Sequence, residues 1–150
     1  MELGRLVRSL LAASEATAPH RATITIHGPE VMLDARRVLP LAMVLVEWFS
    51  NSVKHGAHRA AGGRVEVTWE VAAPPAATSS APPTVTLSWR ERGGPRVDGP
   101  PAASLGTQLV EGFATRDLGG RVTMAYPAEG ASHTIEFPPR GGAAEAGNGA

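Results

Sequence analysis

Apolar and polar residues alternate with a period of two in five short segments of the chain, as they do in half-buried β-strands. The positions between the apolar residues carry mostly Thr, Ser, Arg and Glu, which suit a solvated face. An antiparallel or mixed sheet with one covered face explains this alternation better than a parallel sheet buried on both sides. The expected strands lie around residues 22–26, 65–71, 85–89, 122–126 and 135–137.

Three longer segments place apolar residues at helical spacing and could cover the apolar face of the sheet. Proline is tolerated in a first helical turn and disrupts a helix interior, so Pro40 favours a nearby start for the second helix. The expected helices are Glu2–Ala18, a segment from Arg37 or Pro40 to His55, and Gly106–Asp117. The patterns predict an α/β (α+β) two-layer sandwich. Its mixed, mostly antiparallel sheet of about five strands is covered on one face by three helices.

Two stretches lack such periodicity. Residues 72–83 (AAPPAATSSAPP) are of low complexity and are expected to form a long hairpin connection. Residues 141–150 (GGAAEAGNGA) offer little for a core, and we expect a disordered tail there. The chain is long enough to bury a sizeable core, so a single domain over residues 1–140 is the expected organisation.

Composition and charge exclude several classes of function. The 14 Lys and Arg residues balance 14 Asp and Glu residues, which gives no footprint for nucleic acid or an anionic membrane surface. No apolar run is long enough to span a bilayer, and the N-terminus does not resemble a secretory signal. The absence of cysteine excludes disulfides and thiol nucleophiles. We therefore expect a cytoplasmic protein whose chain does not contact a membrane.

One face of the second helix carries candidate chemistry. Glu47, Asn51 and Lys54 fall within roughly 60° of one another when the helix is projected at 3.6 residues per turn, and His55 borders them. For any one of these residues, the solvated side of an amphipathic helix is an adequate explanation. Asn51 is harder to explain so, because Asn suits caps and turns better than helix interiors, whereas its oxygen suits a hard cation. Glu47 could polarise a reacting group, and Lys54 could neutralise phosphate charge.

These residues belong to a motif. The segment EWFSNSVKHG, residues 47–56, resembles the N box of the GHKL ATPase and kinase superfamily, whose usual pattern is Glu-Leu-x-x-Asn-Ala-x-Lys-Tyr/His-Gly. The resemblance implies a Bergerat-type ATP-binding fold with ATP and Mg²⁺ as cofactors. It also implies that Asn51 ligates Mg²⁺, that Lys54 and His55 contact the nucleotide, and that Glu47 is catalytic.

A glycine-rich turn follows the third strand. The segment WRERGGP, residues 89–95, is similar to the Trp-x-Glu-x-Gly-Gly-Pro element of the HWE subfamily of histidine kinases. In that reading Glu91 accepts a hydrogen bond from the adenine amino group, and Gly93 and Gly94 let the backbone approach the base. Read alone, the segment is better explained as an ordinary strand end followed by a tight turn.

The start of the third helix also resembles HWE proteins. Ser104-Leu105-Gly106-Thr107 is similar to their Gly-Phe-Gly-Ser stretch, which implies nucleotide contacts by Gly106 and Thr107 at a helix N-terminus that suits phosphate. Ser104 could instead act only as a helix cap. Thr134 is a weaker candidate for a nucleotide contact, with a plain sheet residue as the alternative.

The chain departs from the HWE pattern at a few positions. Val46 stands where a histidine is expected, Ser104 replaces a glycine, and Trp48 and Phe49 replace smaller or aliphatic residues. The five histidines all have simpler structural or surface roles than phosphoacceptor. The acceptor is therefore expected in another domain or protein.

Three functions remain open from sequence. The first is a kinase domain that phosphorylates a histidine elsewhere, with a phosphoacceptor domain or a response-regulator pathway protein as partner. The second is a degenerate nucleotide-binding or partner-binding module of the kind found in phosphotransfer proteins. The third is a serine/threonine kinase of the anti-sigma-factor type. The motifs of phosphate-loop nucleotidases, HExxH zinc proteases and GxSxG hydrolases are absent from the sequence.

Overall fold

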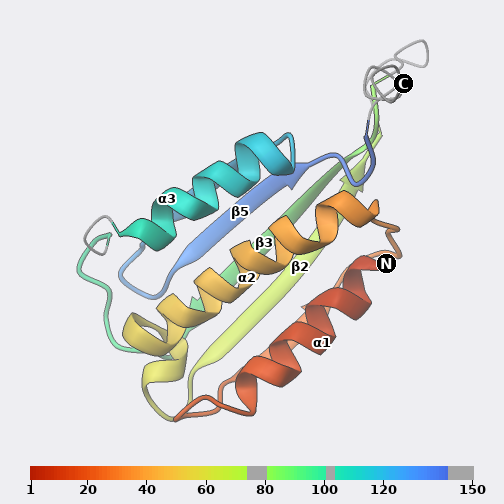
Figure 1. Cartoon of the computed structure of the whole chain (residues 1–150). Helices are drawn as coiled ribbons and strands as arrows, with labels where there is room; N and C mark the ends of the chain where they lie inside the picture. The colour runs from red at the N-terminus through yellow and green to blue at the C-terminus, as the bar shows by residue number, and fades with distance from the viewer. Residues whose placement is uncertain (74–80, 101–103, 142–150) are drawn as a thin grey trace.

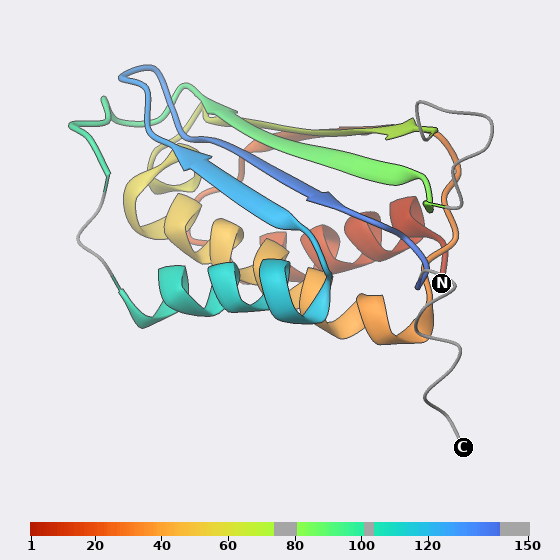
Figure 2. The same ribbon diagram turned by 90° about the horizontal axis from the view of Figure 1, so that it is seen from above.

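A computed structural model describes residues 1–73, 81–100 and 104–141 of the chain. Three helices lie side by side on one face of a five-stranded sheet, and none of the helices in these described ranges covers the other face (Figures 1 and 2). The predicted two-layer sandwich is confirmed. In chain order the elements are α1 (Leu3–Glu15), β1 (Thr23–His27), α2 (Ala35–His55), the 3-10 turn η1 (Ala57–Arg59), β2 (Arg64–Ala72), β3 (Thr84–Arg92), α3 (Leu105–Gly112), the π-helical turn η2 (Phe113–Asp117), β4 (Arg121–Ala125) and β5 (Ser132–Phe137).

The sheet has the strand order β1-β2-β3-β5-β4. Only β1 and β2 are parallel, and the other neighbours are antiparallel, as the alternating pattern predicted. In the central strands every second side chain points to the helices and is buried, which forms the sheet half of the core. These residues are Val65, Val67, Trp69, Val85, Leu87, Trp89, Ile135 and Phe137.

The helix α2 lies along the middle of the sheet and starts earlier than expected. It begins at Ala35, so Pro40 lies inside the helix and not in its first turn. Tertiary contacts account for this start. The backbone N–H of Asp34 donates to the carbonyl of Pro139, and the buried Arg37 guanidinium donates to the carbonyl of Asp117 at 2.9 Å. These contacts hold the first turn in place despite the hydrogen bond that proline removes.

The third helix continues beyond α3 as a π-helical turn. The amide of Leu118 donates to the carbonyl of Phe113 at 2.8 Å, and Gly119 follows with a φ of 65° that ends the helix. Helical structure thus reaches Asp117, as predicted. The connection between β2 and β3 is a hairpin in which Ala72 pairs with Thr84. Residues 74–80 within it, and most of the expected tail (residues 142–150), lie outside the described residues.

Within the described ranges, no helix combines the length and apolar character needed to cross a membrane.

Candidate functional site

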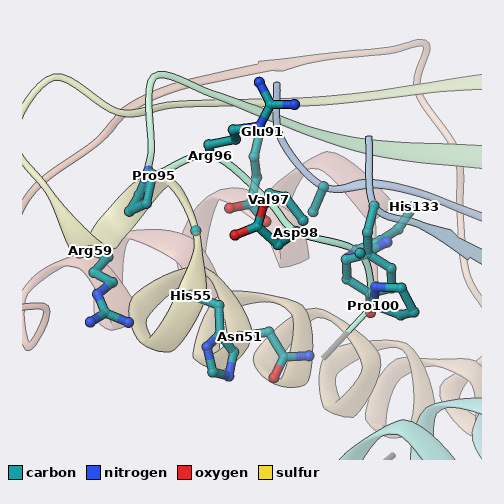
Figure 3. A pocket seen from close by; sticks show the side chains of 14 residues that line it. Asn51, His55, Arg59, Glu91, Pro95, Arg96, Val97, Asp98, Pro100 and His133 are labelled. Atoms are coloured by element: carbon teal, nitrogen blue, oxygen red, sulfur yellow. The ribbon is translucent and has the colours of Figure 1, made fainter. Parts of the chain in front are cut away.

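A cavity of about 460 Å³ lies at the C-terminal end of α2, between this helix and the edge of the sheet where β3 ends and β5 begins. Figure 3 shows side chains of α2 on one side of the cavity, with Glu91, Asp98 and His133 opposite them. The lining residues are Asn51, His55, Gly56, Arg59, Glu91, Pro95, Arg96, Val97, Asp98, Gly99, Pro100, Tyr126, Ala131 and His133.

The helix α2 contributes Asn51 and His55 to the cavity from consecutive turns of one face. Asn51 is half-buried and His55 is exposed. The helix ends at Gly56, whose amide donates to the carbonyl of Ser52 at 2.9 Å. The cavity thus receives an amide and an imidazole from the last two turns of the helix, whereas Glu47 and Lys54, which the helical projection grouped with Asn51, do not line it.

The carboxylate of Glu91 is buried with only 2% of the residue exposed. Its Oε1 accepts a hydrogen bond from the backbone N–H of Ala57 at 2.8 Å, and its Oε2 accepts one from the Trp89 indole at 2.9 Å. A carboxylate has about four acceptor positions, so each oxygen retains capacity for a further donor. The sequence predicted that Glu91 contacts a nucleotide; the structure shows that Glu91 lines the cavity and that the Trp89 indole orients its carboxylate.

The glycine turn after β3 packs against backbone and does not line the cavity. Gly93 adopts a φ of 75°, which favours glycine. A Cβ on Gly94 would lie 2.7 Å from the carbonyl carbon and oxygen of Gly56. The two glycines therefore allow the loop to approach the end of α2, which keeps Glu91 within reach of Ala57.

His133 is a cavity residue that sequence reasoning treated as structural. It is 1% exposed, and burial lowers its pKa to about 4, so the ring is neutral at pH 7. Its ring centroid lies 5.2 Å from that of Trp48 and 5.3 Å from that of Tyr126. Neither ring nitrogen has a hydrogen-bond partner among the described residues. The period-two pattern of β5 was a usable signal, because it places residue 133 on the same face as Ile135 and Phe137.

Tyr126 shares this end of the cavity with His133. Burial, and then the negative charge of Glu91, raise the pKa of the Tyr126 hydroxyl, so it remains protonated. The cavity thus ends in a buried carboxylate, a neutral imidazole and a phenol, a set of groups that can accept and donate hydrogen bonds to the edge of a flat polar ligand.

Glu47 lies one helical turn before Asn51 and faces α3. A Cβ on Gly106 would meet the carboxylate at the end of the Glu47 side chain, so this carboxylate lies directly beside the start of α3. At the same helix start the Ser104 hydroxyl accepts a hydrogen bond from the Thr107 amide at 3.3 Å and caps the helix. Glu47, Gly106 and Thr107 thus lie near one another, although none of them lines the described cavity.

Two other predicted residues lie apart from the cavity. Lys54 is exposed at the end of α2 and does not line it. Thr134 alternates with the buried His133 and Ile135, so its side chain lies on the sheet face away from the helices. The structure brings Asn51, His55 and Glu91 together, but not Thr134. In the described part of the chain, no group of three or more Asp, Glu or His side chains is placed so that it could hold a metal ion.

No protein-family model matches the chain. Among curated proteins, it is 34% identical over 118 residues to blue-light-activated histidine kinase 1 of Erythrobacter litoralis, covering 77% of this chain and 30% of that protein. It is 30% identical over 128 residues to the blue-light-activated histidine kinase of Rhizobium johnstonii, covering 85% and 35%. The chain thus spans about a third of the length of these relatives.

Solved structures of histidine kinases share the fold. A blue-light-activated histidine kinase of Erythrobacter litoralis superposes with a TM-score of 0.70 at 16% identity over 93% of this chain and 42% of that one. The catalytic domain of histidine kinase ThkA, in a nucleotide-free form, gives 0.62 at 17% identity and covers 93% and 96%. ThkA in complex with its response regulator TrrA gives 0.64 at 15% identity, covering 93% and 42%.

The chain is therefore homologous to part of the blue-light-activated histidine kinases, and its fold is that of histidine kinase catalytic domains. The resemblance to this class drawn from the N box and the Trp-x-Glu element is confirmed.

The packing of the glycine turn predicts that an alanine at Gly94 lowers the stability of the protein much more than an alanine at Gly112. Gly94→Ala should lower the free energy of unfolding by about 2–3 kcal/mol, because its Cβ would meet the backbone of Gly56 and strain the loop. The control is Gly112→Ala in α3, whose Cβ would meet only the end of the flexible Arg116 side chain. Urea unfolding of both variants tests this, and equal stability of Gly94→Ala and wild type would contradict it.

The neutral state of His133 predicts a pH-dependent stability. Its folded pKa of about 4 lies below the ordinary value of 6.5, so the unfolded chain binds the proton more readily between these values. The contribution is fully present above about pH 6.5 and is lost as the pH falls to about 4, a loss of about 3 kcal/mol. His133→Phe should therefore flatten the decline of the unfolding free energy over this window, whereas His20→Gln, at an exposed site, should not. Parallel curves for wild type and His133→Phe would refute the assignment.

Proposed function

We propose that the chain is the catalytic domain of a cytoplasmic two-component histidine kinase. In this proposal it binds Mg-ATP in the cavity at the end of α2, and the γ-phosphoryl group passes to a histidine in another domain or protein. One observation carries the proposal: Asn51 and His55 of the N box face the buried carboxylate of Glu91 across a single cavity. The names of the homologues, which are histidine kinases, favour histidine over serine or threonine as the acceptor.

The cavity suits a nucleotide in size and in the distribution of its groups. Its volume of about 460 Å³ lies within the roughly 300–1,000 Å³ typical of small-molecule sites. The end formed by the buried Glu91 and His133 and the half-buried Tyr126 suits the base, with the carboxylate as acceptor for the adenine amino group. The phosphates would then extend towards Asn51 and the start of α3.

Asn51 fits the role of magnesium ligand. Its side chain is half-buried at the cavity, and Mg²⁺ is commonly bound through few protein ligands, with phosphates and waters completing the octahedron. Gly106 and Thr107 lie at the N-terminus of α3, where free amides and the helix dipole suit phosphate oxygens. Lys54 and His55, both exposed in the last turn of α2, would add positive charge or hydrogen bonds at the phosphate end.

Glu47 is the candidate for proton acceptance. In the proposed transfer, an imidazole nitrogen of the acceptor would bond to the γ-phosphorus while the bond from this phosphorus to the β-phosphate oxygen breaks and ADP leaves, and the imidazole would give up its N–H proton. The Glu47 carboxylate lies half-buried on the helical face of Asn51, beside the first turn of α3, where it can take that proton. The neighbouring Val46 is 40% exposed and takes the place of the histidine in the HWE pattern, so it offers no second base.

A response-regulator pathway protein is the proposed partner. The support comes from ThkA, a structural neighbour that has been solved in complex with a response regulator.

The metal role of Asn51 can be tested directly. Asn51→Ala should lower the affinity for Mg²⁺ and an ATP analogue by tenfold or more, in line with about 1.5–3 kcal/mol for a bond to a charged partner. The apo melting temperature should stay near that of wild type. Isothermal titration with and without Mg²⁺ measures the affinity for the ATP analogue. The control is Ser50→Ala on the same helix, which should bind like wild type. Unchanged binding by Asn51→Ala would remove this residue from the site, whereas a wild-type protein that binds no nucleotide would reject the function itself.

Glu91 should determine the preference for adenine. A carboxylate accepts from the adenine amino group but repels the carbonyl oxygen that guanine carries at this position, so ATP should bind more tightly than GTP. Glu91→Gln should reduce this ratio by about tenfold or more, the equivalent of about 1.5–3 kcal/mol. The control is Asp98→Asn, which changes the other carboxylate that lines the cavity. Competition binding of ATP and GTP measures the ratio of the two affinities. An unchanged ratio in Glu91→Gln would exclude Glu91 as the residue that selects adenine.

A further inference from the structure

A second polar network lies behind the nucleotide cavity, at the other side of the turn that follows α2. The Ser52 hydroxyl lies 2.7 Å from Nδ1 of His58, and Nε2 of the same ring contacts the carboxylate of Glu15. Ser52 and His58 are fully buried, and the Glu15 side chain is 16% exposed. The network thus joins α1, α2 and η1, three elements that meet beside the site.

The three side chains can satisfy one another in a consistent set of hydrogen bonds. With a proton on Nε2, the His58 ring donates to Glu15, and Nδ1 can accept from the Ser52 hydroxyl. The Ser52 oxygen in turn accepts from the backbone N–H of His58 at 3.3 Å. A buried polar network satisfied in this way fixes its members tightly, whereas removal of one member leaves others unpaired in the interior.

The arrangement resembles the Ser-His-carboxylate sets of hydrolases, but its burial excludes that chemistry. The Ser52 residue is 0% exposed, so no substrate reaches its oxygen. It is, however, adjacent in sequence to Asn51, and its carbonyl accepts the amide of Gly56, which lines the cavity. The N-box pattern has alanine at this position, so the hydroxyl is a feature of this chain.

The turn after α2 is therefore held from two directions. From the sheet, Glu91 binds the amide of Ala57. From α1, Glu15 binds the side chain of the next residue, His58, and through it Ser52. Because Asn51 and the turn share this short segment, a change at the end of α1 alters the geometry of the cavity edge.

We propose that Glu15, His58 and Ser52 are positioning residues that set the end of α2 for nucleotide binding and couple the site to α1. This inference rests on the proposed function. Glu15→Ala and Ser52→Ala should each weaken binding of Mg²⁺ with an ATP analogue by about tenfold, within the usual range of coupling between sites. Glu15→Gln, whose amide oxygen can still accept from Nε2, should restore most of the affinity.

Two controls separate positioning from general loss of stability. Ser14→Ala removes a neighbouring hydroxyl that donates to the carbonyl of Leu10 within α1 and should leave affinity unchanged. Val7→Ala removes part of a fully buried α1 side chain and should lower the melting temperature without weakening binding at temperatures well below it. If Val7→Ala weakens binding as much as Glu15→Ala at a matched loss of melting temperature, or if Glu15→Ala binds like wild type, the proposal is overturned.

A readout without nucleotide distinguishes this proposal from the proposed function. In the apo protein, Glu15→Ala and Ser52→Ala should accelerate hydrogen exchange at the amides of Gly56 and Ala57, whereas Ser14→Ala should not. Unchanged exchange at these amides overturns the positioning role even if wild type binds ATP. If exchange is faster in the two variants but the wild-type protein binds no nucleotide, the coupling to α1 is supported and only the nucleotide function is rejected.

Discussion

The buried carboxylate of Glu91 joins the sheet to the end of α2, and the geometry of the site depends on this connection. Its two oxygens accept hydrogen bonds from the amide of Ala57 and the indole of Trp89. An ionised group is costly to bury unless it is hydrogen-bonded, so these donors and the carboxylate fix one another. The position of the turn after α2 follows from that constraint, and with it the edge of the cavity.

Close backbone packing makes the connection possible. Gly94 rests against the backbone of Gly56, at a distance that leaves no room for a side chain. Gly93 supplies the left-handed conformation that the loop needs to turn back. The glycines that suggested an approach of backbone to nucleotide thus bring two protein segments together. The cavity beside them is lined by the following residues of the same loop, from Pro95 to Pro100.

The fold is shared with histidine kinase structures at only 16–17% identity, so the sandwich tolerates extensive substitution. In this chain the end of α2 carries a buried polar network, formed by Ser52, His58 and Glu15, at a place where the N-box pattern has alanine. Such networks are favourable only when every member has a partner. This one ties α1 to the same turn that Glu91 holds from the sheet.

Local patterns in the sequence were enough to predict the strands and the face of α2 that contributes to the cavity. The period-two segments predicted the strands, and helical spacing placed Asn51 and His55 on one face of α2, because both periodicities are properties of a single element. Resemblance to a family added Glu91. The period-two pattern of β5 puts residue 133 on the covered face with Ile135 and Phe137 and Thr134 on the opposite face, but it does not tell that residue 133 lies at a cavity, and helical spacing did not predict that α2 begins at Ala35. Those outcomes depend on which strand pairs with which and on contacts such as Arg37 with Asp117, and interactions between residues distant in sequence form only when the whole chain is folded.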